Sequence, residues 1–371
     1  MKDSLLDVLC CPKCFGELKL QADIRTDNII TKGELYCQKC KTSFVVHESV
    51  PVFGVEDSTK KERFKEIKGE NEWIINANEI QDHLNFAQES SKAGERIIRK
   101  INSKRHDLNR KLKVLDIGSG WGCFQSWQFA SNDFEVVAVD ICPEFILASD
   151  LVSKSKFFER VISDCTILPF INCSFDVIFC KELIHHVGNA SDLLDEIWRV
   201  ASPDALIIIK EPCTSTLITT LMRRERIAKI DVAAKVGVTH YYLTYGSCLK
   251  YMKSIAGELE IDRENLIIDQ HRFKLLSILQ QPILTIERIK FFNRMFSTMH
   301  LILIGGNLEI IGRKRKGYKA QISRVRDIFQ IHVQTINMQQ IDYYRNVLIP
   351  QTFKIFRSAN TGMDSPRIVS K

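Results

Sequence analysis

The sequence predicts an α/β protein: a Rossmann-like sheet with helices on both faces, preceded by a small β-rich module and followed by a helical tail. Between residues 111 and 210, apolar strand segments such as KVLDIG and FEVVAVD alternate with helical segments, which is typical of buried parallel strands. Near the start of the chain, two Cys-x-x-Cys pairs indicate a metal-stapled module. The 371 residues suffice for two domains.

The paired cysteines lie in a segment that we assign to residues 1–57. A Cys-x-x-Cys turn directs two thiolates at one ion, and two such turns complete a closed, tetrahedral structural zinc (Zn2+) site. The predicted ligands are Cys11, Cys14, Cys37 and Cys40. Because so small a module builds little core, zinc would supply much of its folding free energy. The alternative, redox chemistry, needs only one such pair.

This segment resembles the zinc-ribbon family that activates methyltransferases by binding them as a separate subunit. The resemblance rests on LLDVLCCPKC, LYCQKC and the closing SVPVF, and it covers about fifty residues. It implies that the ribbon docks on an enzyme. Because the ribbon precedes other domains in the same chain, docking would be intramolecular, at a high effective concentration.

Residues 58–110 are predicted to form a helical linker or cap. Their first part, STKKERFKEIKGE, is charged and has no apolar face. Further along, apolar residues recur at roughly helical spacing: Trp73, Ile74, Ile80, Leu84, Phe86, Ile97 and Ile98. One or two amphipathic helices there would pack on the sheet or cover a ligand as a lid.

The strongest motif is VLDIGSGWG, within a predicted domain of residues 111–312. Glycine lets the backbone approach a ligand where a Cβ atom would collide, and the next helix starts with free N–H groups. The dinucleotide spacing is G-x-G-x-x-G, which holds a pyrophosphate. The spacing here is G-x-G-x-G, which suits a ligand with a charged amino-acid end, such as S-adenosyl-L-methionine (SAM). The loop residues predicted to bind it are Asp116, Gly118, Ser119, Gly120 and Gly122.

Acidic residues follow the next two strands. Asp140 is placed to accept hydrogen bonds from both ribose hydroxyls, and Asp164 to receive an adenine amino group. The backbone N–H of Cys165 is predicted to meet the ring edge. Ile141 and Lys181 complete the predicted cofactor-binding set. A domain that binds another nucleotide, or that no longer binds SAM, is the alternative interpretation.

This segment resembles the class I SAM-dependent methyltransferases, above all the subgroup of quinone-biosynthesis and small-molecule enzymes. The resemblance rests on the glycine loop, both strand-end acids, the strand FDVIFCKELIHHV and the stretch 196–212. It implies SAM contacts at Asp116, Gly118, Gly120, Asp140, Asp164 and Cys165. One departure is Asp204-Ala205, where that family usually has a glycine pair.

Methyl transfer is an in-line displacement, so the protein mainly has to hold the acceptor atom behind the methyl group. A general base is needed only where the acceptor loses a proton. His186 is the predicted catalytic residue, with His185 and Glu182 as alternatives; histidines at such a junction also pack or cap the next helix. Acceptor selectivity is expected from an insertion at about 211–300. LILIGGNLEIIGRK is expected to form a closing hairpin that turns at residues 305–307.

The formal net charge of +7 is concentrated at the end of the chain. Residues 312–371 hold twelve Lys and Arg against three Asp and Glu, so the remaining chain, with 40 basic and 42 acidic residues, has a net charge of −2. The predicted tail, residues 313–371, is basic and amphipathic. It is either a solvated surface, a contact for nucleic acid or an anionic membrane, or a docking element for its own enzyme or a second copy in a homo-oligomer.

These features predict a methyltransferase that acts on a small molecule or metabolic intermediate. The second interpretation is a ribosomal RNA base methyltransferase whose ribbon aids RNA recognition. The third is a SAM-binding scaffold without catalysis. The sequence shows neither a signal-peptide pattern nor an apolar run of the ~18–20 residues that span a bilayer. Since its other cysteines are scattered singly, we expect a cytoplasmic protein.

Overall fold

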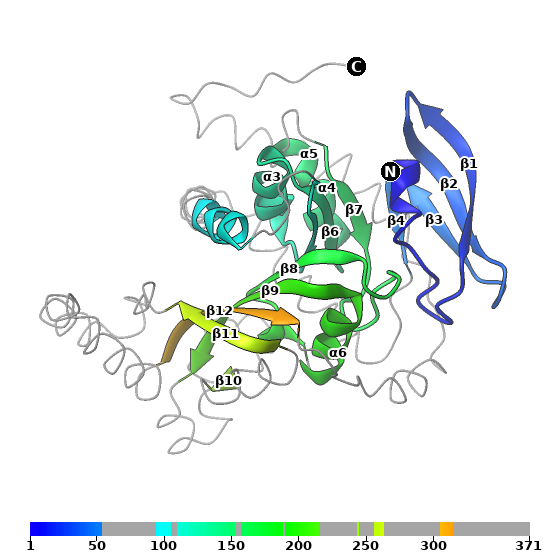
Figure 1. The fold of residues 1–371 in the computed structure, drawn as a ribbon. Coiled ribbons are helices and arrows are strands. Elements are labelled where there is room, and N and C mark those ends of the chain that lie inside the picture. Colours follow the sequence, from blue (N-terminus) through cyan, green and yellow to red (C-terminus); the bar gives the residue numbers. More distant parts are fainter. Residues whose placement is uncertain are drawn as a thin grey trace, which may run out of the picture.

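In the computed structural model, the described residues are 1–53, 94–104, 110–152, 157–187, 190–214, 243–244, 256–262 and 305–314. Their strands form one mixed sheet in the order β1-β2-β3-β4-β7-β6-β5-β8-β9-β12-β11, with β10 beside β9 (Figure 1). The strands are β1 (Leu18–Thr26), β2 (Ile29–Cys37), β3 (Ser43–His47), β4 (Val50–Val52), β5 (Lys113–Ile117), β6 (Glu135–Asp140), β7 (Glu159–Ile162), β8 (Phe175–Lys181), β9 (Ala201–Thr214), β10 (Leu243–Thr244), β11 (Ala256–Asp262) and β12 (Gly305–Lys314).

The central strands β7, β6, β5, β8 and β9 are parallel, as the sequence predicts. The strand order changes direction at β5, which lies between β6 and β8 although it precedes both in the chain. In open α/β sheets, ligands bind beyond the carboxyl ends of the strands at such a switch point. The glycine loop follows β5, so the fold places it at the usual position of a nucleotide site.

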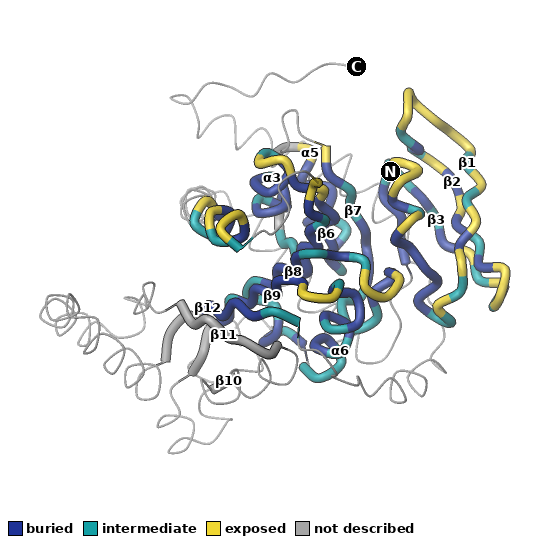
Figure 2. Tube along the Cα trace, in the orientation of Figure 1, coloured by how far each residue is buried: buried dark blue, intermediate teal, exposed yellow. Residues whose placement is uncertain are grey.

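Alternate side chains of the central strands enter two cores on opposite faces of the sheet. Ile178 and Cys180 of β8 join a cluster with α6 (Ala190–Val200), whereas Val177 and Phe179 join a cluster with α3 (Phe124–Ser131). The second cluster also includes α4 (Pro143–Leu147) and a helix over residues 94–103. The short helix α5 (Ser149–Val152) follows α4. Helices therefore cover both faces, and the predicted fold class is confirmed (Figures 1 and 2).

The N-terminal module extends the same sheet. Val52 of β4 pairs in parallel with Ile162 of β7, and the backbone N–H of Phe53 donates to the carbonyl oxygen of Ile162 at 2.9 Å. A second contact joins the segment after the 3-10 helix η1 (Asp3–Leu5) to the segment after β7. There, Leu9 forms an isolated antiparallel β-bridge with Phe170. Most buried apolar side chains of the N-terminal module belong to the same cluster as α6, while Val50 and Val52 belong to the cluster with α3. The module therefore shares its core with the central sheet.

The end of the sheet differs from the predicted closing hairpin, and this expectation was wrong. Residues 305–307 continue β12 and pair with residues 212–214 of β9, so they form no turn. The antiparallel partner of β12 on its other side is β11, which lies about fifty residues earlier in the chain. The paired glycines indicated a turn, but glycine is also accommodated where two strands lie close together.

The departure at Asp204-Ala205 has a structural explanation. Ala201 pairs with Phe175 and Leu206 pairs with Val177, so the residues between them bulge from β9. Asp204 has a φ of +61°, in the left-handed region that favours glycine. Aspartate tolerates this conformation better than most residues. Asp204 therefore takes the backbone conformation that a glycine would adopt, far from the glycine loop.

Much of the predicted cap (58–93 and 105–109), most of the predicted insertion and tail residues 315–371 lie outside the described residues. The described helix at 94–103 is fixed to the sheet by Arg96, whose guanidinium lies 2.5 Å from the carboxylate of Glu309 in β12. None of the helices in the described ranges is long and apolar enough to cross a membrane.

Candidate cofactor pocket and metal centre

The glycine loop after β5 has the backbone conformation that its sequence predicts. Gly118, Gly120 and Gly122 have φ values of +68°, +66° and +73°. The N–H groups of Gly118 and Ser119 both donate to the carbonyl oxygen of Val139, at 2.8 and 3.0 Å, which holds the loop against β6. A Cβ atom on Gly120 would meet nothing within 4 Å, so its backbone faces open space that a ligand can occupy.

Asp140 lies at the end of β6, directly beside this loop. Its Oδ2 accepts a hydrogen bond from the N–H of Gly120 and its Oδ1 accepts one from the N–H of Cys142, both at 2.9 Å. An ionised carboxylate has about four lone-pair sites, so it can accept further bonds from a diol. The residue is 8% exposed and cannot turn away. Ile141, predicted beside it, is half-buried.

Asp116 lies on β5 beneath the loop and is fully buried. It accepts a hydrogen bond from Ser126 Oγ of α3 at 2.6 Å. Burial, together with the negative charge of Asp140, raises the pKa of Asp116 to about 7, while Ser126 and Lys181 act in the opposite direction. Lys181, at the end of β8, is half-buried and lies 3.9 Å from Glu182.

Asp164 lies on the loop that follows β7. Its Oδ1 accepts hydrogen bonds from the backbone N–H and the hydroxyl of Thr166, at 2.8 and 2.7 Å, which fixes the carboxylate in a local turn. Cys165 is half-buried beside it. The carbonyl oxygen of Asp140 accepts the N–H of Ser163, so this turn is tied to the end of β6. Both strand-end acids therefore lie at one edge of the sheet.

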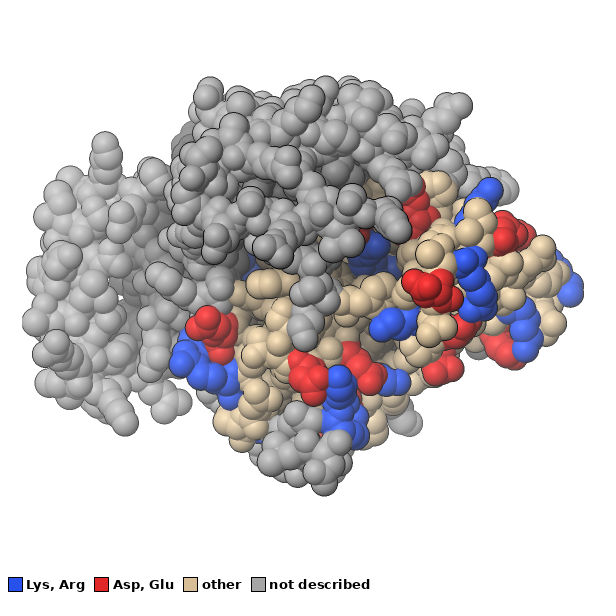
Figure 3. All heavy atoms as spheres, turned by 90° about the horizontal axis from the view of Figure 1, so that it is seen from above, with Lys and Arg blue, Asp and Glu red and all other residues tan. Residues whose placement is uncertain are grey.

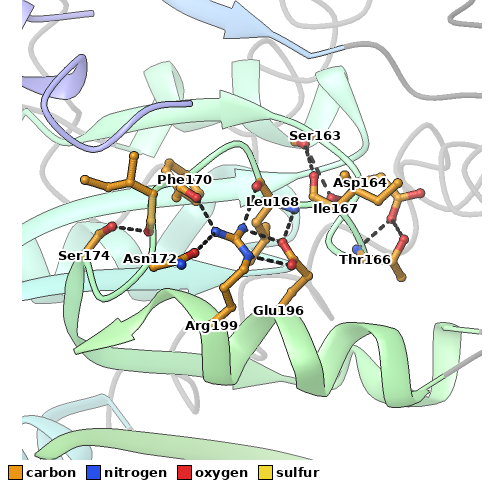
Figure 4. Close-up of polar contacts among 11 residues, drawn as sticks. Ser163, Asp164, Thr166, Ile167, Leu168, Phe170, Asn172, Ser174, Glu196 and Arg199 are labelled. Atoms are coloured by element: carbon orange, nitrogen blue, oxygen red, sulfur yellow. Dashed lines mark hydrogen bonds and ion pairs between the residues drawn. The ribbon is translucent and has the colours of Figure 1, made fainter. Parts of the chain in front are cut away.

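A buried ion pair holds the other end of this loop (Figure 4). The guanidinium of Arg199 contacts both carboxylate oxygens of Glu196, at 2.7 and 2.6 Å, and donates to the carbonyl oxygens of Leu168 and Phe170. Glu196 in turn accepts the N–H of Leu168 at 2.7 Å. Both charged side chains come from α6 and are almost completely buried.

The histidine pair follows β8 in the 3-10 helix η4 (Ile184–His186). His186, the predicted catalytic residue, is half-buried, and His185 is buried. Their ring centroids lie 4.1 Å apart. His185 Nδ1 lies 2.8 Å from Glu211 Oε2, and Glu211 is a residue that the sequence analysis did not assign to the site.

The four predicted zinc ligands come together. The Sγ atoms of Cys11, Cys14, Cys37 and Cys40 all lie within 4.8 Å of one another, with separations of 3.5 Å for Cys11–Cys40 and Cys14–Cys37. Four thiolates at this spacing fit a tetrahedral zinc ion. Cys10 is not in this group. Its backbone N–H donates to the carbonyl oxygen of Pro169, and burial raises the pKa of its thiol to about 12.

Three residues that contact the predicted site or its loops were not identified from the sequence: Glu211, Ser126 and Arg199. Glu211 follows the apolar strand LIIIK, so the rule that identified Asp140 and Asp164 would have found it. Ser126 and Arg199 lie inside helices and show no local pattern. Ser126 bonds Asp116, ten residues away, and Arg199 bonds carbonyl oxygens about thirty residues away in addition to its neighbour Glu196, so only the fold brings these distant partners together.

Two family models match the chain: a Trm112p-like protein over residues 2–49 and a methyltransferase domain over residues 115–209. A ubiquinone biosynthesis O-methyltransferase of Rickettsia canadensis is 30% identical over 31% of this chain and 48% of its own length. Phosphoethanolamine N-methyltransferase 1 of Triticum aestivum is 25% identical over 29% of this chain and 22% of its own. The chain thus spans less than half the length of these curated relatives.

Solved structures also share parts of the fold. Phosphoethanolamine N-methyltransferase 2 of Haemonchus contortus, in complex with S-adenosylhomocysteine, has a TM-score of 0.40 at 16% identity and covers 58% of this chain and 51% of that one. A chain from a complex that contains the Haloferax volcanii Trm112 methyltransferase activator has a TM-score of 0.39 at 14% identity, over 58% of this chain and 88% of that one. The present chain joins a Trm112p-like zinc-ribbon domain to a methyltransferase domain.

Proposed function

We propose that this chain is a SAM-dependent methyltransferase that methylates a small molecule or metabolic intermediate. The observation that carries the proposal is the meeting of the open glycine loop with Asp140 and Asp164 at one edge of the sheet. Asp140 would accept the two ribose hydroxyls, and Asp164 and the N–H of Cys165 would meet the adenine. Asp116 lies on the side where the cationic amino-acid end would enter.

When bound, SAM supplies an electrophilic methyl group on a sulfonium sulfur. The chain's own residues then have to hold the acceptor in line and, for a hydroxyl acceptor, take up its proton. We assign the proton acceptor to His186, which is half-buried at the carboxyl end of β8. Lys181, at the end of the same strand, would line the cofactor side. Residues of the predicted insertion would contribute acceptor specificity.

A small-molecule acceptor is favoured by two observations. The curated relatives named above are a ubiquinone biosynthesis O-methyltransferase and a phosphoethanolamine N-methyltransferase. RNA-binding surfaces carry an excess of positive charge, whereas residues 1–53 hold seven Lys and Arg and seven Asp and Glu. Side chains of both signs are mixed over the described ribbon surface in Figure 3.

The ribbon's partner is proposed to be the methyltransferase domain of the same chain. The parallel pairing of β4 with β7, together with the contacts of Leu9 and Cys10 to residues 169–170, supports this proposal. A separate partner is not needed for these contacts. Contact of the tail with nucleic acid or an anionic surface, and a homo-oligomer, remain further hypotheses.

The test is incubation of the purified full chain with methyl-labelled SAM and a cell extract, followed by separation of small molecules, RNA and protein. We expect label in the small-molecule fraction and none with Asp140→Ala. Label in the RNA fraction, together with RNA binding whose affinity falls steeply as the salt concentration rises, would favour the RNA interpretation. Tight SAM binding with no labelled fraction would favour the non-catalytic scaffold.

A further inference from the structure

Glu211 lies at the carboxyl half of β9 and is 1% exposed. Its Oε1 accepts the backbone N–H groups of Leu183 and Ile184, each at 2.7 Å, and its Oε2 lies 2.8 Å from Nδ1 of His185. One buried carboxylate thus receives three N–H groups from consecutive residues of the segment between β8 and α6. Charge-assisted bonds of this kind are about twice as strong as neutral ones.

The contact to His185 defines the state of that ring. An ionised carboxylate only accepts hydrogen bonds, so Nδ1 of His185 carries the hydrogen. In a neutral imidazole the other nitrogen, Nε2, is then the acceptor. His185 is 6% exposed, which leaves little room for a substrate to reach it. Its ring instead packs against that of His186, at a centroid distance of 4.1 Å and an interplanar angle of 38°.

We infer that Glu211 is a positioning residue for methyl transfer, acting through His185 on His186. The carboxylate fixes the start of η4 by two backbone bonds, and it fixes the plane and tautomer of His185. The His185 ring then limits the orientation of the His186 ring. The negative charge of Glu211 lies against His185, whose ring packs on that of His186, so it also stabilises an imidazolium that forms when His186 takes up a proton. The positioning of His185 by Glu211 is argued from contacts alone, and only its role in methyl transfer rests on the proposed function.

Glu211→Gln separates this role from a merely structural one. The Gln side chain has nearly the same shape, and its carbonyl oxygen can still accept the N–H groups of Leu183 and Ile184. Its amide nitrogen, however, donates a hydrogen where Oε2 accepted one. His185 must then present a bare Nδ1 and carry its hydrogen on Nε2. The variant therefore inverts a tautomer while it keeps the backbone contacts.

The primary experiment is a long-range 15N–1H spectrum of the full chain labelled at histidine nitrogens, with His185 assigned from His185→Asn. We expect a protonated Nδ1 and a bare Nε2 for His185 in the unsubstituted protein, and the reverse in Glu211→Gln. Glu182→Gln, a neighbouring acid on the same segment, should leave the His185 tautomer unchanged.

This readout requires no turnover, so it stays informative if the proposed reaction is wrong. A bare Nδ1 on His185 in the unsubstituted chain would overturn the inference even if Glu211→Gln fails to fold. With an acceptor in hand, we expect kcat to fall at least about tenfold in Glu211→Gln while the KM for SAM stays within about twofold, because general acid–base groups contribute 10²–10⁴-fold. An unchanged kcat beside an inverted tautomer would also overturn it.

Discussion

The guanidinium of Arg199 lies over the ring of Phe15, with Cζ 4.8 Å from the ring centroid. Phe15 follows the first pair of zinc ligands, whereas Arg199 belongs to α6 of the methyltransferase domain. The same guanidinium holds the carbonyl oxygens of Leu168 and Phe170, on the loop that starts at Asp164. One side chain therefore contacts both the metal-binding turn and the loop of the candidate cofactor pocket.

Replacing this arginine should be costly. Arg199→Met would leave Glu196 as an uncompensated charge, since that carboxylate is 1% exposed. Breaking a buried pair in this way costs about 3–5 kcal/mol of unfolding free energy. Denaturant unfolding measures it. The exposed pair Lys111–Asp133 is the control, where Lys111→Ala should leave the unfolding free energy almost unchanged because surface ion pairs contribute little. Equal losses in the two variants would contradict the assignment.

Two loop glycines should respond differently to alanine. Both have positive φ, which costs about 1–2 kcal/mol for a residue with a Cβ atom. A Cβ atom on Gly118 would also lie 2.9 Å from the side chain of Leu183, whereas one on Gly120 meets nothing. We expect Gly118→Ala to lose more stability, and Gly120→Ala to stay better folded but to lose cofactor affinity. A Gly120→Ala variant with full affinity would show that no ligand approaches there.

Asp116 should make stability depend on pH. Because its pKa is raised to about 7, the folded chain retains a proton that the unfolded chain releases near pH 4. The folded state binds more protons between these values, so unfolding free energy should fall as pH rises from about 4 through about 7, by on the order of 4 kcal/mol. Denaturation at a series of pH values tests this. Asp116→Asn should remove this contribution, and an identical slope in both proteins would disprove it.

Zinc removal should affect more than the ribbon. Most buried apolar side chains of the zinc module share a cluster with α6, and the remaining ones join the cluster with α3, so the described module shares its core with the central sheet. In Cys37→Ser we expect the zinc content to fall well below one ion per chain. We also expect the midpoint of thermal unfolding to decrease for the ribbon and the central sheet together. Metal analysis and calorimetry measure both quantities. Cys173→Ser, at an exposed cysteine outside the cluster, is the control. Full zinc retention in Cys37→Ser would contradict the four-cysteine site.

The local motifs were predictable from the sequence because the structure that each motif indicates depends only on the spacing of nearby residues. The Cys-x-x-Cys pairs, the glycine loop and the acids at 140 and 164 each lie in a short segment whose geometry follows from its neighbours. The alternation of strands and helices likewise identified the parallel sheet. The structure brings the four cysteines together, gives the loop glycines positive φ and places Asp140 beside that loop.

The long-range relationships were not predictable. Nothing near Val52 indicates that it pairs with Ile162, and nothing near Arg199 indicates Phe15 or Phe170 as partners. The pair Gly305-Gly306 was interpreted as a turn because glycine favours turns, yet pairing with β9 keeps it extended. In each case tertiary contact decides between conformations that the local sequence allows.

Calorimetric titration of the purified full chain with SAM tests the central claim most directly. The account predicts binding of one SAM per chain, and its loss in Asp140→Ala with the circular dichroism spectrum and thermal midpoint largely preserved. Asp176→Ala changes an acid near the start of β8, at the opposite edge of the sheet from the glycine loop, and this variant should bind SAM normally. No affinity of the folded chain for SAM, a preference for NAD, or unchanged affinity in Asp140→Ala would contradict it.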